Sequence, residues 1–211
     1  MSVGESTPGG NVAISADQVK RLRETTGAGM MDCKRALEET GGDLDRAVEL
    51  LRVKGLADAK KRQSRVAREG VVDAYIHMNG RLGVLVEVNC ETDFVADTEA
   101  FRTAARDIAM HVAASDPRWI SREDVPEDVI EGERKLYAEQ GREQGKPDNV
   151  IERIVQGKLE AFYKDNCLLD QPFVRDDTKT VGELVSETSG KVGEKVEVRR
   201  FARFKLGEEI S

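Results

Sequence analysis

Few side chains in this sequence could perform covalent chemistry. The two histidines, His77 and His111, have no recognisable catalytic partner, and neither a GxSxG nucleophile elbow nor an HExxH zinc motif occurs. An ordinary packed or surface histidine is the simpler interpretation of both. The three cysteines, Cys33, Cys90 and Cys167, lie far apart without CxxC spacing, which indicates free thiols in a reducing compartment and no zinc site.

Glycines followed by lysine could hold phosphate groups. Gly-Lys pairs occur at residues 145–146, 157–158 and 190–191, but none continues with the Ser or Thr that a P-loop needs for magnesium. The turn at residues 27–29 lacks the third glycine and the preceding strand of a dinucleotide-binding motif. We therefore predict no catalytic residue, no metal and no cofactor, and we do not expect an enzyme.

A basic run between about Lys60 and Arg68 could touch RNA. It contains no aromatic residue for base stacking, so a solvated helix or an interdomain hinge is the simpler interpretation. The net charge of the chain is −7, whereas nucleic-acid-binding domains are normally basic. Residues 1–69 hold 13 basic and 11 acidic side chains, so the excess negative charge lies in the remainder.

The most unusual feature is the segment CETDFVA at residues 90–96. It follows a predicted strand and places Phe94 and Val95 in a polar turn. Phe94 could fold back onto the core, where its burial would stabilise the protein by about 1.5–3 kcal/mol. It could instead be an exposed aromatic anchor for a partner protein. The residue pattern alone favours the buried position and leaves the anchor open.

The elements that must position this segment predict an α+β protein. Three short helices separated by glycine turns form a predicted small bundle from about Ile14 to Gly55. We expect Gly55 to end the third helix. Ser15 and Gln18 form a predicted capping box at the start of the bundle. Four parts are expected: a disordered lead-in, a helical N-terminal domain, a linker helix and an α+β core or dimerisation domain, at residues 1–12, 13–55, 56–69 and 70–211.

The hydrophobic period changes from helical to strand-like at Gly70. Residues 71–78 and 82–88 predict two strands joined by a two-residue Asn79-Gly80 turn. A third strand is expected near the C-terminus, in a small antiparallel sheet covered by helices that include a helical hairpin. The corresponding ranges are 195–206 for the strand and 98–114, 127–145, 147–165 and 181–187 for the helices. No apolar run is long enough to span a membrane and no secretory signal opens the sequence, so we expect a cytoplasmic protein.

Six segments, spread over nearly the whole chain after residue 12, carry a family resemblance. They are VKRLRETTGAGMMDCKRALEETGGDLDRAVELLRVKG at 19–55, NCETDFVADTEAF at 89–101, IAMHVAASDP at 108–117, GKP at 145–147, QPFV at 171–174 and TVGEL at 180–184. They closely resemble bacterial elongation factor Ts. The resemblance implies a guanine-nucleotide exchange factor for the GTPase elongation factor Tu in translation elongation. Such a factor binds the GDP-bound and nucleotide-free GTPase and promotes GDP release.

The resemblance also implies roles for individual residues. Thr92-Asp93-Phe94-Val95 matches the loop that displaces the partner's magnesium ion, with Phe94 wedged between two helices of the GTPase. The helical unit resembles a domain shaped like a ubiquitin-associated domain that docks near the partner's nucleotide pocket. Met30 and Met31 of this unit, together with His111, are expected secondary contacts.

The oligomeric state is also suggested by the resemblance. Longer members of the family carry a duplicated core, whereas this sequence shows one sheet unit and resembles the short form, in which two copies pair. We therefore expect a homodimer, and Cys167 is the cysteine that we expect at the contact between the two copies. We expect no nucleic-acid or membrane partner. A ubiquitin-associated-like adaptor and an RNA-binding module remain as rival functions.

Overall fold

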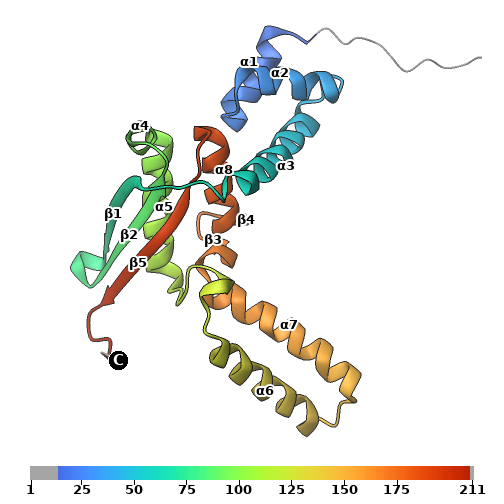
Figure 1. Cartoon of the computed structure of the whole chain (residues 1–211), viewed down its shortest axis with the longest axis vertical. Helices are drawn as coiled ribbons and strands as arrows, with labels where there is room; N and C mark the ends of the chain where they lie inside the picture. Colours follow the sequence, from blue (N-terminus) through green and yellow to red (C-terminus); the bar gives the residue numbers. More distant parts are fainter. Residues whose placement is uncertain (1–13, 210–211) are drawn as a thin grey trace, which may run out of the picture. The chain divides into compact units, whose positions relative to one another are not determined.

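The computed structural model describes residues 14–209, and the chain divides into two compact units, residues 1–61 and 62–211. The lead-in predicted to be disordered, residues 1–12, lies outside the described residues. Eight helices and a small antiparallel sheet within the described range confirm the α+β prediction (Figure 1).

The first unit is a bundle of three helices, α1 (Ala16–Thr26), α2 (Met30–Glu39) and α3 (Leu44–Arg62). The capping box forms as predicted, because Ser15 Oγ accepts the Gln18 N–H at 3.2 Å and Gln18 Oε1 accepts the Ser15 N–H at 2.9 Å. Gly27 ends α1 in the left-handed region, at φ 68°. The buried side chains are Val19, Leu22, Cys33, Ala36, Leu37 and Ala47.

The prediction that Gly55 ends the third helix is wrong. α3 continues through Gly55 to Arg62, and the next strand begins at Glu69. A glycine inside a helix costs only about 1 kcal/mol relative to alanine, which neighbouring helical residues can offset. The basic stretch is therefore helical at its start and leaves the helix after Arg62.

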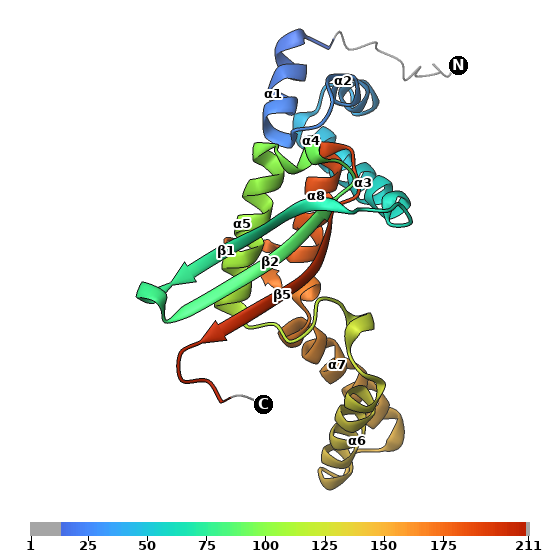
Figure 2. The ribbon, with the colours of Figure 1, turned by 60° about the vertical axis from the view of Figure 1, so that its left-hand side comes forward.

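The second unit is built on a three-stranded antiparallel sheet in the order β1 (Glu69–His77), β2 (Leu82–Cys90) and β5 (Glu197–Lys205). Alternate residues of β2 are buried against α5 (Glu99–Ser115), which packs on β1 and β2 and also contacts α8 (Val181–Val192) (Figure 2). The fully buried side chains of this core include Val86, Val88, Phe101, Ile108, Val112, Leu168 and Val181.

The turn between β1 and β2 is longer than the predicted two residues. His77 still pairs with Leu82, so four residues, from Met78 to Arg81, make the connection. Met78 and Asn79 both adopt positive φ, at 50° and 55°. The Asn-Gly pair thus predicted the position of the hairpin correctly, but the predicted loop length was wrong.

The remaining elements lie beside the sheet or extend from it. α6 (Glu127–Glu143) and α7 (Asp148–Asn166) form the predicted helical hairpin, which extends away from the sheet (Figure 1). The shorter elements are α4 (Asp93–Ala96), β3 (Pro172–Phe173), β4 (Asp176–Thr180) and three 3-10 turns at Met78–Gly80, Arg122–Asp124 and Leu168–Asp170.

Candidate functional site

The segment Thr92–Ala96 forms a single helical turn, α4, between the end of β2 and the start of α5 (Figure 1). Thr92 caps this turn, since its hydroxyl accepts the Val95 N–H at 3.4 Å. Val95 and Ala96 pack against the core of the second unit, whereas Phe94 is 82% exposed. The buried position of Phe94 that the residue pattern favoured is therefore wrong.

The reason for the exposure of Phe94 is geometric. Successive residues of a helix point about 100° apart, so one turn can bury only the side chains that face the core. Here that side holds Val95 and Ala96, and it leaves Phe94 projecting outward. The Asp93 carboxylate accepts the Phe94 N–H at 2.9 Å, which holds an acidic group at the backbone of Phe94. The turn thus presents an exposed aromatic ring and a carboxylate on a support packed into the core.

Two carboxylates outside this turn hold its backbone. Glu194 accepts hydrogen bonds from the N–H groups of Glu91 and Thr92, and Glu91 accepts one from the Lys195 N–H. The latter bond holds the pKa of Glu91 below its usual range, so this carboxylate is ionised at neutral pH. Glu194 could not be recognised from the sequence, because 102 residues separate it from Thr92 and no local pattern links them.

The cysteines carry no chemistry at this site. Burial raises the pKa of Cys90 to about 11, and its thiol donates to the Thr92 carbonyl at 3.1 Å. Burial likewise raises the pKa of Cys167 to about 11, and this side chain lies wholly inside a cluster with Phe162 and Val125. Cys167 is therefore not at the surface, and the expectation that it lies at a dimer contact is wrong.

His111 lies on α5, 12 residues beyond the first residue of that helix, or about 18 Å along it. The structure does not bring it next to Phe94. The ring is fully buried, with Nε2 2.9 Å from Gln171 Oε1 and Nδ1 accepting the Val174 N–H at 3.2 Å. Acceptance at Nδ1 requires the proton on Nε2, so the ring is a neutral tautomer that joins α5 to the segment before β4.

Burial gives His111 a pH dependence that can be measured. Desolvation lowers its pKa below 6.5, although the Gln171 bond opposes the shift. The unfolded chain therefore takes up a proton first, and the free energy of unfolding falls as the pH drops below about 6.5 towards the lowered pKa. We expect urea unfolding to show that the free energy of unfolding of wild type falls from pH 7.5 to 5 and approaches the value of His111→Gln. Parallel stability curves for wild type and His111→Gln over this pH range would contradict the assignment.

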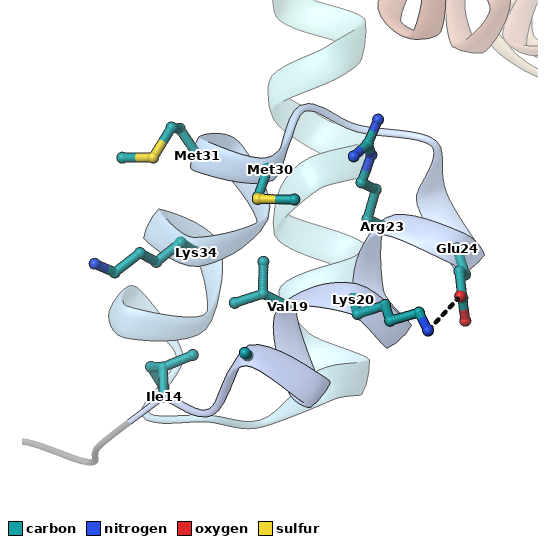
Figure 3. Close-up of a pocket in the computed structure, with 9 residues that line it drawn as sticks. Ile14, Val19, Lys20, Arg23, Glu24, Met30, Met31 and Lys34 are labelled. Carbon is teal, nitrogen blue, oxygen red and sulfur yellow. Dashed lines mark ion pairs between the residues drawn. The ribbon is translucent and has the colours of Figure 1, made fainter.

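The two methionines predicted as partner contacts border an open groove in the first unit. The groove lies between α1 and α2, has a volume of about 750 Å³ and is lined mainly by apolar side chains (Figure 3). Met30 and Met31 are both exposed there. Methionine adapts its shape to apolar surfaces, so it suits a docking face. Basic side chains also border the groove, namely Lys20, Arg23 and Lys34.

A second apolar surface lies on the side of the sheet opposite α5. In the strand register, Ile76 of β1 is opposite Gly83 of β2, which is opposite Phe204 of β5, and Leu85 lies two residues further along β2. Phe204 is 70% exposed and Leu85 48%, and Val72 and Ile76 are also exposed. We call Val72, Ile76, Leu85 and Phe204 the outer sheet face. Val72 is opposite Glu87, which forms an ion pair with Arg200 at 2.6 Å, so the apolar part of this face centres on Ile76, Leu85 and Phe204. Exposed apolar side chains gathered in this way mark interaction surfaces.

Within residues 14–209, no three His, Cys, Asp or Glu side chains are grouped so that they could hold a metal ion. In the same part of the chain, no helix is long and apolar enough to cross a membrane.

Comparison with known proteins gives a consistent result. A family model described as Elongation factor TS matches residues 34–208. A protein named Elongation factor Ts from Thermoanaerobacter pseudethanolicus is 58% identical over 197 residues, which cover 93% of this chain and 97% of that protein. A protein of the same name from Carboxydothermus hydrogenoformans is 57% identical over 198 residues, which cover 94% of this chain and 91% of that protein. The Elongation factor Ts from Fervidobacterium nodosum is 54% identical over 195 residues, which cover 92% of this chain and 99% of that protein.

Proposed function

The chain belongs to the elongation factor Ts family, and we propose that it is a guanine-nucleotide exchange factor for elongation factor Tu. It binds the GDP-bound GTPase and promotes release of GDP during translation elongation. The observation that carries this proposal is the ring of Phe94, 82% exposed on a turn whose neighbouring residues are packed into the core. A large apolar side chain held in water in this way is typical of an interface anchor.

We propose that Thr92, Asp93, Phe94 and Val95 act together to displace the magnesium ion of the bound GTPase. Magnesium bridges the nucleotide phosphates and the protein that binds them, so a small displacement removes a large local charge interaction. Phe94 inserts between two helices of the GTPase, and Asp93 lies beside the ring at the edge of the contact. This mechanism needs no covalent step, so the protein acts without a catalytic residue or a cofactor of its own.

Thermodynamic coupling requires further contacts. The factor by which this protein weakens GDP binding is also the factor by which GDP weakens binding of this protein. Moving a two-state equilibrium from 1:99 to 99:1 takes about 5.5 kcal/mol, more than the 1.5–3 kcal/mol that burial of one phenylalanine supplies. The interface should therefore exceed about 1,000 Å². Met30 and Met31 at the groove of the first unit supply an apolar second contact.

His111 contributes to partner binding through the backbone that it holds. Its buried ring accepts the Val174 N–H, and Val174 is an exposed apolar residue. A secondary contact of the His111 region with the GTPase would then be made by the surface around Val174, with the imidazole as internal support.

We also propose that the protein is a homodimer joined through its outer sheet face. Val72, Ile76, Leu85 and Phe204 form an apolar surface that a second copy could cover. A two-fold axis would place the same patch of both copies in contact, which is the usual arrangement in homodimers.

The function is tested by release of fluorescent GDP from bacterial elongation factor Tu in excess unlabelled GDP. We expect the release rate to rise with added protein and to saturate. Binding without acceleration would contradict exchange and would favour an adaptor. Binding to RNA that weakens steeply with salt would favour the RNA module instead.

A further inference from the structure

The backbone that leads into Phe94 leaves the sheet at Cys90. β1 pairs with β2 up to Cys90, and β5 pairs with it up to Asn89. The N–H groups of Glu91 and Thr92 therefore have no strand partner, although partly buried N–H groups need an acceptor. A turn of four residues is also too short to be stable without external support. Something outside the sheet must therefore fix the direction of this segment.

That support is a carboxylate from the far end of the chain. Glu194 Oε2 accepts the N–H groups of Glu91 and Thr92, each at 3.0 Å, and its Oε1 accepts the Thr92 hydroxyl at 2.7 Å. In return, Glu91 Oε1 accepts the Lys195 N–H at 2.6 Å. We call these four hydrogen bonds, three to the Glu194 carboxylate and one to the Glu91 carboxylate, the carboxylate clamp. Hydrogen bonds to charged groups are about twice as strong as neutral ones.

Glu194 is itself held in a defined place. Gly193 ends α8 in the left-handed region at φ 76°, and the buried Ser189 hydroxyl donates to the Glu194 carbonyl at 2.6 Å. Helix α8 packs on α5, so the clamp ties the segment before Phe94 to the helical layer of the core.

The clamp also orients the cap of the helical turn. The Thr92 hydroxyl has one proton, which it donates to Glu194 Oε1. This leaves an oxygen lone pair to accept the Val95 N–H. Loss of the carboxylate would therefore release two N–H groups and the hydroxyl at the same time, immediately before Asp93 and Phe94.

We propose that Glu194 is a positioning residue for nucleotide exchange, which acts by fixing the direction in which Phe94 projects. Phe94 is largely exposed, so the place of its ring depends on the backbone of residues 91–96. The inference rests on the proposed exchange function and adds to it a residue that does not contact the nucleotide site through its own side chain.

The test measures GDP release from elongation factor Tu against the concentration of each variant. Glu194→Ala is expected to lower the maximal release rate about tenfold, because small misplacements of a positioned group have effects of this order or larger. The half-saturating concentration should change little, since the groove of the first unit is intact. Glu194→Gln keeps one carbonyl acceptor and should recover part of the rate. Glu187→Gln removes a charge from α8 that pairs with Lys179 at 2.7 Å, and it should behave as wild type.

A double variant separates positioning from a general structural role. If Glu194 acts through Phe94, Phe94→Ala combined with Glu194→Ala should be no slower than Phe94→Ala alone. Multiplied effects in the double variant would overturn the inference, as would a wild-type maximal rate for Glu194→Ala beside a defective Phe94→Ala. A wild-type rate for Phe94→Ala would instead show that the proposed role of the loop has failed. Faster amide hydrogen exchange at Glu91 and Thr92 in Glu194→Gln, with an unchanged melting temperature, would support the clamp.

Discussion

Replacement of Phe94 by alanine is expected to lower the maximal rate of GDP release from elongation factor Tu by about 30-fold or more. Truncation of an interface hot spot costs about 2 kcal/mol or more, and each 1.4 kcal/mol is a factor of ten. The variant should fold normally, because the ring is 82% exposed and contributes little to the core. The measurement is the saturating rate of fluorescent GDP release, with the melting temperature recorded alongside.

The matched control for this variant is Leu136→Ala. Leu136 is an exposed apolar residue on α6, in the helical hairpin, and it belongs to none of the proposed contact surfaces. Its removal should leave the rate and the melting temperature close to those of wild type. A Phe94→Ala protein that releases GDP as fast as wild type would rule out the wedge, even though family membership would stand.

Replacement of Leu85 by lysine is expected to convert the proposed dimer to a monomer. Leu85 lies on the central strand β2, and its outward neighbours across the sheet are Ala74 and Ala202, so the centre of the outer sheet face is apolar. An unpaired charge buried there against a second copy costs about 3 kcal/mol or more, which weakens dimerisation roughly 100-fold. The folded monomer should survive, because Leu85 is 48% exposed within one chain.

Sedimentation equilibrium at micromolar concentration measures this change. Wild type should sediment at twice the chain mass of 23.4 kDa and Leu85→Lys at the chain mass. Leu136→Lys, the same substitution on the helical hairpin, should remain a dimer. If Leu85→Lys is still a dimer, the interface must lie on another surface. If wild type is a monomer, the homodimer proposal is wrong.

Much of the fold could be predicted from short segments of sequence. The Ser15–Gln18 capping box and the glycine turn after the first helix were expected at their positions, because each depends on contacts within one helical turn. The antiparallel pair around Asn79 and the hairpin of α6 and α7 were likewise found from local periodicity and turn residues. Gly55 was misjudged because one glycine weakens a helix without determining where it ends.

The candidate site was only partly predictable. The segment Thr92–Val95 was singled out from the sequence, but the residue pattern alone favoured a buried Phe94, because a single turn has no periodicity that tells which side chain faces the core. An exposed Phe94 was implied only by the family resemblance. His111 was expected near a partner surface, whereas packing of α5 against the segment at Gln171 buries it. Cys167 was expected at a dimer contact, and the cluster around Phe162 encloses it instead.

Residue type and short-range spacing were enough to predict the α+β class, the order of the main helices and strands, and the segment that carries Phe94. Packing of distant segments sets three further features of residues 14–209: Phe94 projects into solvent, the outer sheet face stays exposed and Glu194 supports the turn. These features arise from contacts between residues as far apart as Glu91 and Glu194, which are 103 positions apart along the chain. Such contacts form only when the sheet and helices pack, and no local pattern records them.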